Sequence, residues 1–96
     1  MIKRIVKMTF QPEKVNEFKS VFEQNWKLIK SFPGCSHVEL LQVASEPNVF
    51  FTYSIWDHED SLNRYRDSEL FAGVWGRTKV LFSDRPEAWT VNELTF

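Results

Sequence analysis

The sequence is poor in the residues that build common cofactor sites. Its only cysteine, Cys35, cannot form an internal disulfide, and the chain carries no sign of an oxidising compartment. The only imidazoles are His37 and His58, and Cys35 and His37 could project from one side of a strand, but two ligands without a third make a weak metal site. With three glycines, the chain has no glycine-rich loop that could cradle a phosphate. The sequence therefore predicts no metal, nucleotide or flavin cofactor.

An excess of charge of one sign is also missing. Twelve basic and thirteen acidic residues give a net charge of -1, which provides no electrostatic footprint for nucleic acid or an anionic membrane. The longest stretch without a charged residue, Pro47 to Trp56, is ten residues long and too short to span a bilayer. Lys3, Arg4 and Lys7 interrupt the apolar N-terminus, so we expect no signal peptide. The sequence predicts a single soluble domain over residues 1–96, located in the cytoplasm.

Aromatic residues are abundant instead. Nine Phe, four Trp and two Tyr residues stand in a chain of 96 residues, which is dense for a domain with a small interior. Aromatic side chains carry much apolar area, and they favour cores, interfaces and pockets for flat ligands. The sequence therefore predicts an extensive flat apolar surface inside the protein, at an interface, or at both.

Apolar residues recur with the strand period of two in some segments and with the helical period in others. Ile2, Val6, Met8 and Phe10 share even positions, which predicts a strand with one buried face. The predicted elements are strands over Ile2–Phe10, Ser36–Ala44, Asn48–Trp56 and Ala88–Phe96, a helix from Pro12 that ends before Pro33, and a helix capped by Asp57 that breaks at Arg66–Ser68 and continues from a Ser68 cap to Pro86.

The order β-α-β-β-α-β predicts an α+β fold of the ferredoxin-like type, with a four-stranded antiparallel sheet and both helices on one face. The third strand carries large apolar residues on both faces, which places it in the middle of the sheet. In the last strand, Trp89 and Val91 are expected opposite Leu94 and Phe96. A face without helices would then leave an apolar patch in water. We therefore expect a homodimer that buries this face against a second copy.

Four short segments stand at the joints of these predicted elements. They are Pro12-Glu13 at the start of the first helix, Pro33-Gly34-Cys35 before the second strand, Trp56-Asp57 at the end of the third strand, and Ser68-Glu69-Leu70-Phe71 in the second helical region. With the element order, they resemble the antibiotic biosynthesis monooxygenase family of dimeric α+β barrels over nearly the whole chain. The resemblance implies a dimeric barrel that oxygenates electron-rich phenols or quinols without metal or flavin.

The catalytic residues of two studied branches of that family are absent here. The heme-degrading branch uses an Asn, a Trp and a His where this chain has Val6, Tyr65 and Trp75. Without a His to ligate iron, the resemblance argues against heme degradation. Quinol-oxidising and autoinducer-processing relatives often have a His at the position of Tyr65.

A third branch, the aromatic polyketide monooxygenases, shares Trp56 but has an Asn and a Tyr where this chain has Thr52 and Leu62. In the mechanism that the resemblance implies, ionisation of the substrate supplies the electron density that reacts with dioxygen, inside an apolar pocket that excludes water. We predict that Tyr65 orients a substrate oxygen and that Trp56 donates a hydrogen bond to the substrate. The predicted substrate-binding residues are His37, Thr52, Phe71, Gly73 and Trp75.

Gly73 and Gly76 lie three residues apart on one helix face, where each costs about 1 kcal/mol relative to alanine. Either the helix packs closely on the sheet or kinks there, or the missing side chains leave room for a flat ligand beside Tyr65 and Trp75. The sequence thus predicts a cofactor-independent monooxygenase acting on a small aromatic phenol or quinol. Its departures from the family's catalytic pattern favour a second hypothesis, a non-catalytic dimeric module that binds a small apolar ligand or another protein. A third is an isomerase on the same barrel.

Overall fold

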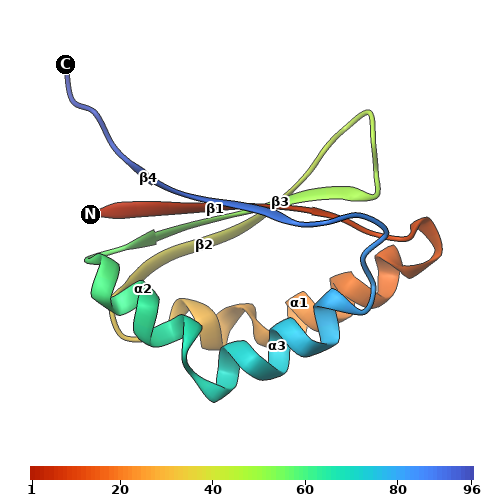
Figure 1. The fold of residues 1–96 in the computed structure, drawn as a ribbon, viewed down its shortest axis with the longest axis horizontal. Coiled ribbons are helices and arrows are strands. Elements are labelled where there is room, and N and C mark those ends of the chain that lie inside the picture. The colour runs from red at the N-terminus through yellow and green to blue at the C-terminus, as the bar shows by residue number, and fades with distance from the viewer.

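The computed structural model describes residues 1–96 and places three helices on one face of a four-stranded antiparallel sheet (Figure 1). The other face of the sheet carries no helix. The elements are β1 (Ile2–Thr9), the 3-10 turn η1 (Pro12–Lys14), α1 (Val15–Lys30), β2 (Cys35–Gln42), β3 (Val49–Trp56), α2 (Glu59–Arg66), α3 (Glu69–Lys79) and β4 (Glu87–Asn92).

The strands lie in the order β2-β3-β1-β4. β3 therefore lies between β2 and β1, and β1 lies between β3 and β4, so each helical crossover skips one strand. This is the split βαβ arrangement of the ferredoxin-like fold, and it confirms the predicted fold class. The inner place of β3 agrees with its apolar residues on both faces.

The first helical region begins more tightly than expected. Pro12 opens a 3-10 turn before α1, whose buried side chains are Phe18, Val21, Asn25 and Ile29. The chain then turns at Gly34, which has a φ of 90° and whose carbonyl oxygen accepts a hydrogen bond of 2.8 Å from the amide of Asp57. A side chain at this position would collide with Ser61, so glycine allows the start of β2 to approach α2 closely.

The second helical region is broken, as the sequence predicts, but its first cap is different. His58, rather than Asp57, is the N-cap of α2, and its Nδ1 accepts a hydrogen bond of 3.0 Å from the amide of Asp60. Ser68 caps α3 as expected, with its Oγ accepting from the amide of Phe71 at 3.1 Å. α3 ends at Lys79 instead of reaching Pro86. The chain after it pairs with the end of β1, where Phe82 bridges to Phe10.

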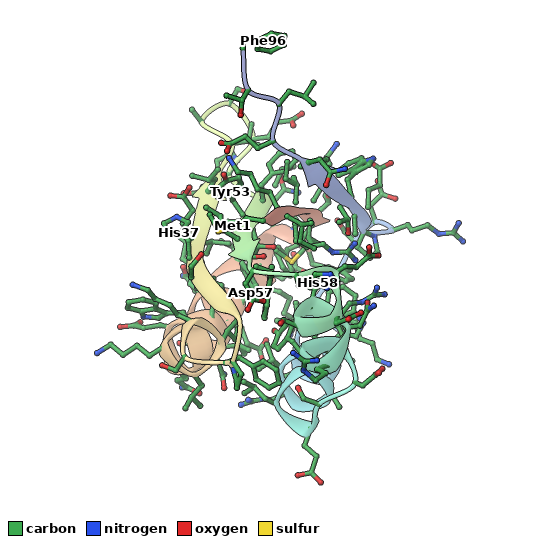
Figure 2. The ribbon with its side chains drawn as sticks, turned by 90° about the vertical axis from the view of Figure 1, so that its left-hand side faces the viewer. Met1, His37, Tyr53, Asp57, His58 and Phe96 are labelled. Atoms are coloured by element: carbon green, nitrogen blue, oxygen red, sulfur yellow. The ribbon has the colours of Figure 1, made fainter.

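The last strand is shorter than the predicted Ala88–Phe96. β4 ends at Asn92, which pairs with Ile2, the first residue of β1. No further residue of β1 is left to pair with the chain, so residues 93–96 form a tail. The tail leaves the sheet on the side away from the helices, with Phe96 at its end (Figure 2). Leu94 and Phe96 are therefore exposed in one copy of the chain and do not lie opposite Trp89 and Val91 as strand residues.

The core is an aromatic cluster at one end of the layer between sheet and helices. Phe10 is completely buried, and its ring centroid lies 4.0 Å from that of Phe18 and 5.7 Å from that of Phe50. Met8 and Leu81 complete this buried cluster. The remainder of the layer is less tightly filled, and it holds the cavity described below.

The uncovered face, here called the open face, carries the alternate residues of the same strands. Ile5 of β1 pairs with Tyr53 of β3 and Trp89 of β4 across this face. Trp89 and Leu41 are close to half exposed, whereas Trp56 and Phe50 on the helix-covered face are almost fully buried. No helix is both long enough and apolar enough to cross a membrane.

Candidate functional site

A cavity of about 360 Å³ lies between the sheet and the helices. Strands β1 and β3 contribute the residues at even positions, helices α1, α2 and α3 supply most of the rest, and Val38 of β2, Ala88 of β4 and Pro86 complete the wall. Its size is in the range of small-molecule sites, and most of its lining is apolar or aromatic. Five of the seven residues predicted for the site line this cavity, namely Thr52, Trp56, Tyr65, Phe71 and Trp75.

The aromatic side chains form a continuous wall. The Trp56 and Tyr65 rings are stacked with centroids 5.2 Å apart, and Tyr65 meets the edge of Phe71 at 5.3 Å. Phe71 and Trp75 are stacked at 5.8 Å with nearly parallel planes. The break between α2 and α3 makes this possible, because it brings Tyr65 at the end of one helix against Phe71 at the start of the next. Such rings offer flat apolar surfaces to a planar ligand.

The Tyr65 hydroxyl is a polar group inside this wall. It makes no hydrogen bond within the protein, and a water-sized molecule can reach it. Burial, and to a smaller extent the nearby Cys35, raise the pKa of Tyr65 to about 12. At neutral pH Tyr65 is therefore a neutral phenol that can donate or accept one hydrogen bond, and it is not a base.

Trp56 is 1% exposed, and its indole N–H is already used. Nε1 donates a hydrogen bond of 3.0 Å to Oγ of Ser54, two residues earlier on the same strand face. Ser54 also lines the cavity, and its hydroxyl keeps a proton that it can donate. The polar group next to Trp56 in the cavity is therefore a Trp56–Ser54 pair rather than a free indole.

Gly73 and His37 do not line the cavity. No atom lies within 4 Å of a side chain added at Gly73 or Gly76, so close packing of α3 on the sheet is not the reason for these glycines. His37 lies on the open face, where its ring meets the edge of Tyr53 at 5.9 Å and its Nε2 is 3.5 Å from the Glu39 carboxylate (Figure 2).

The structure separates the two metal-ligand candidates of the sequence. A bulge at the start of β2 pairs Cys35 with Trp56 and His37 with Ile55, so the two side chains lie on opposite sheet faces. The expectation that they project to one side is wrong. No group of three His, Cys, Asp or Glu side chains is placed to hold a metal ion.

Sequence reasoning missed the charged residues of the cavity. Arg4 on β1 and Arg66 on α2 both line it, and no acidic residue does. Arg4 stands at an even position between Ile2 and Val6, so the strand period already directed it inward, and that was the signal available. Arg66 was assigned only to the break between the helices. Arg66 and Ala88 are exposed as well as lining, which indicates that the cavity opens to solvent beside them.

The positions that differ from the family's catalytic residues lie around the same space. Val6, Leu62 and Trp75 line the cavity together with Thr52 and Tyr65. A valine and a leucine can exclude water but cannot bind a proton or a metal. The chemistry of this cavity therefore depends on Tyr65, the Trp56–Ser54 pair, Thr52 and the arginines.

Comparison with solved structures gives many likenesses over the full chain. One, described as antibiotic biosynthesis monooxygenase, has a TM-score of 0.93 and 15% identity and covers 99% of this chain and 100% of its own. A conserved protein from Methanosarcina mazei Go1 has a TM-score of 0.92 and 20% identity, over 97% and 92% of the two chains. PA3566 from Pseudomonas aeruginosa has a TM-score of 0.87 and 16% identity, over 98% and 94%. At these identities the likeness shows the fold.

The comparison with curated proteins finds no match. The family description "Antibiotic biosynthesis monooxygenase", in contrast, matches residues 1–74, from β1 into α3. This range includes β3, α2 and the start of α3, which supply Trp56, Tyr65 and Phe71 to the cavity. The chain belongs to the antibiotic biosynthesis monooxygenase family.

Proposed function

We propose that this protein is a cofactor-independent monooxygenase that oxidises a small aromatic phenol or quinol in the cavity. The observation that carries the proposal is the unpaired hydroxyl of Tyr65, held inside a wall of stacked aromatic rings. A flat apolar pocket excludes water, and one hydrogen-bonding group can fix a substrate oxygen within it. Membership of a family described as monooxygenases supports the reaction type.

The residues of the cavity orient the substrate in this proposal. Tyr65 stays neutral because its pKa is raised to about 12, so it holds a substrate oxygen through a hydrogen bond without taking the proton. Trp56 supports the Tyr65 ring from behind and fixes Ser54 through its N–H, and the Ser54 hydroxyl then faces the ligand as a donor. Holding reactants in one geometry is itself a large part of catalysis.

The substrate supplies the electrons for the reaction. No carboxylate, imidazole or thiol lines the cavity, so the substrate proton leaves through the solvent-open side. The electron-rich anion then reduces dioxygen. For a methylene group activated by aromatic rings, two C–H bonds are lost and one C=O bond forms. One oxygen atom enters the product and the other leaves as water.

The functional assembly in this proposal is a homodimer joined through the open face. Ile5, Tyr53 and Trp89 form a contiguous apolar surface there, and a monomer would expose it to water. A two-fold axis lets the same surface cover itself. Leu94 and Phe96, exposed on a tail that points to the same side, would find apolar contacts on the second copy.

Oxygen uptake tests the reaction. Purified protein is mixed with a panel of reduced quinols and anthrone-like phenols, and uptake is compared with buffer. We expect faster uptake with the wild type and a loss of about 10- to 100-fold in Tyr65→Phe, which removes the hydroxyl but keeps the ring. Tyr53→Phe is the matched control, because the same atom is removed on the open face. Trp56→Phe tests the indole N–H.

The same assay separates the alternatives. The absence of an ionisable base in the cavity favours one of them, a non-catalytic module that binds a small apolar ligand. Ligand binding without oxygen uptake across the panel would establish that function. Conversion of a substrate without oxygen uptake would indicate an isomerase. A cytoplasmic location and the absence of a bound metal or cofactor stay predictions of the sequence.

A further inference from the structure

Two arginines line a cavity whose other residues are uncharged and mostly apolar. Arg4 comes from the middle of the sheet and Arg66 from the last residue of α2. No Asp or Glu side chain lines the same space. Positive charge next to aromatic walls, with no negative charge to balance it, is unusual for a site built only to hold an uncharged ring.

One hydrogen bond orients Arg4 within the sheet. It lies on the helix-covered face of β1, directly between Ser54 of β3 and Thr90 of β4. Its Nη1 donates a hydrogen bond of 3.0 Å to Oγ1 of Thr90. A guanidinium has five N–H donors, so most of the donors of Arg4 remain for another acceptor.

Both arginines line the cavity, and both carry a positive charge. Burial lowers the pKa of Arg4, and the charge of Arg66 lowers it further. Neither residue forms an ion pair, although Lys3 pairs with Glu93 and Lys14 with Glu17 elsewhere in the chain. An arginine that merely packed its stem on the surface would normally direct its charge to water or to a carboxylate. Here Arg4 is partly buried in the cavity wall, and Arg66 lines the cavity where it opens to solvent.

We propose that the cavity binds a planar aromatic anion, whose carboxylate or phenolate oxygen is held by the guanidinium groups of Arg4 and Arg66. Guanidinium is suited to this role, since its fixed fork of donors binds anionic oxygens strongly. The ring of the ligand lies against Trp56, Tyr65 and Trp75. The inference rests on the proposed function for the site, and it adds the charge of the substrate.

An anion also answers a question that the cavity raises. Oxidation without cofactor needs an ionised substrate, yet no base lines the cavity. Two positive charges lower the pKa of a bound phenol by favouring its charged form. The arginines therefore act by stabilising the anion, and solvent receives the proton.

Calorimetric titration tests the preference for an anion without any turnover. 2-Naphthoate is compared with 2-naphthamide, which has nearly the same shape and no charge. We expect naphthoate to bind at least about tenfold more tightly in the wild type, and the difference to shrink as salt is raised. Arg4→Gln and Arg66→Gln should each reduce the difference. Arg77→Gln on the exposed side of α3 is the matched control and should retain it.

A second arm distinguishes a phenolate from a carboxylate as the bound group. 4-Nitrophenol absorbs visible light as its anion and not as the neutral phenol. At a pH where both forms are present, the wild type and Arg77→Gln should raise the visible absorbance, and Arg4→Gln should raise it less. A response to naphthoate alone assigns the site to carboxylates, and a response to both assigns it to aromatic anions in general; either supports the inference.

Equal binding of naphthoate and naphthamide, or of neither, would overturn it if the visible absorbance of 4-nitrophenol also stays unchanged, whereas a response to 4-nitrophenol alone assigns the site to phenolates and supports it. An unchanged preference in both Arg4→Gln and Arg66→Gln, two variants at separate places in the fold that are not expected to fail together, would also overturn it. The result is independent of the proposed reaction. Anion binding without oxygen uptake supports this inference and removes the monooxygenase, whereas oxygen uptake with no preference for an anion does the reverse.

Discussion

The two faces of the sheet are built from neighbouring residues of the same strands and have different surroundings. On the helix-covered face, Phe50 and Trp56 of β3 are 1% exposed. On the open face, Trp89 of β4 is 44% exposed and Leu41 of β2 is 48% exposed. The inner strand β3 carries large apolar residues on both faces, while its neighbours also place Lys3, Lys7 and Glu39 on the open face. The comparison shows that an inner strand with large apolar residues on both sides needs two covering layers, of which this chain supplies one.

The largest effect on assembly is expected on the open face. Ile5→Asp places a carboxylate in the centre of that face, between Tyr53 and Trp89. In a two-fold dimer a carboxylate is then buried in each copy, with Lys3 and Lys7 of the same face to offset part of the cost, so dimer affinity should fall at least about tenfold. Sedimentation equilibrium measures the change. Leu28→Asp, the same chemical change at an exposed position of α1, should leave the dimer intact. A wild type that sediments as a monomer would contradict the comparison.

The largest effect on stability is expected on the helix-covered face. Phe10→Ala removes a completely buried ring that contacts Phe18 and Phe50, and it should lower the free energy of unfolding by about 3–5 kcal/mol. Trp89→Ala, made in the Ile5→Asp background to keep the chain monomeric, should cost less than about 1 kcal/mol. Urea unfolding of both gives the contrast. Similar losses for the two would show that the open face is packed within one chain.

A third test uses the burial of Tyr65 on the helix-covered side. The unfolded chain releases this proton near pH 10, and the folded protein only near its raised pKa of about 12. The stabilisation that comes from keeping Tyr65 protonated is therefore complete below pH 10 and is lost as the pH rises to 12. The free energy of unfolding should fall by about 2–3 kcal/mol over this range for this reason. Chemical unfolding of wild type and Tyr65→Phe across this range isolates the effect, because the lysines titrate in both. If the free energies of unfolding of wild type and Tyr65→Phe change in parallel with pH, Tyr65 is not buried as described.

The smallest effect is expected where α3 faces neither the cavity nor the sheet. Gly73→Ala meets no atom within 4 Å and should stabilise the helix by up to about 1 kcal/mol without changing ligand affinity. Gly34→Ala gives the opposite sign, because its φ of 90° and its contact with Ser61 leave no room for a side chain. Thermal melts and naphthoate titration measure the pair. Weaker ligand binding in Gly73→Ala would show that Gly73 is part of the ligand site.

The elements were predictable because local signals agree with the final contacts. The period-two pattern of β1, the break before Ser68 and the central place of β3 are all visible in the sequence. The end of β4 was not, because it depends on where β1 begins and hence on a partner far away in the chain. The cap of α2 was assigned to Asp57 from its general preference, whereas the backbone places His58 there.

The candidate site was predictable in its aromatic part and less so in its charges. Trp56, Tyr65 and Trp75 stood out as amphipathic residues on elements that meet. The strand period placed Arg4 on the inward face, but an arginine near the N-terminus was interpreted as surface charge, because its role depends on the cavity that the helices form above it. His37 was misplaced because the bulge at the start of β2 shifts its register and turns the ring to the open face.

The alternation along β1 also governs which changes in length the protein can accept. Arg4, Val6 and Met8 point into the cavity layer, and Ile5 points to the open face. Deleting or inserting one residue within β1 would exchange these two sets, placing apolar Ile5 where the anion is held and the guanidinium in the dimer contact. The turn at 43–48 and the tail at 93–96 do not alternate between the cavity and the open face, so a change in their length exchanges no side chains between the two. Natural variation in length is therefore expected at these two places and excluded from β1.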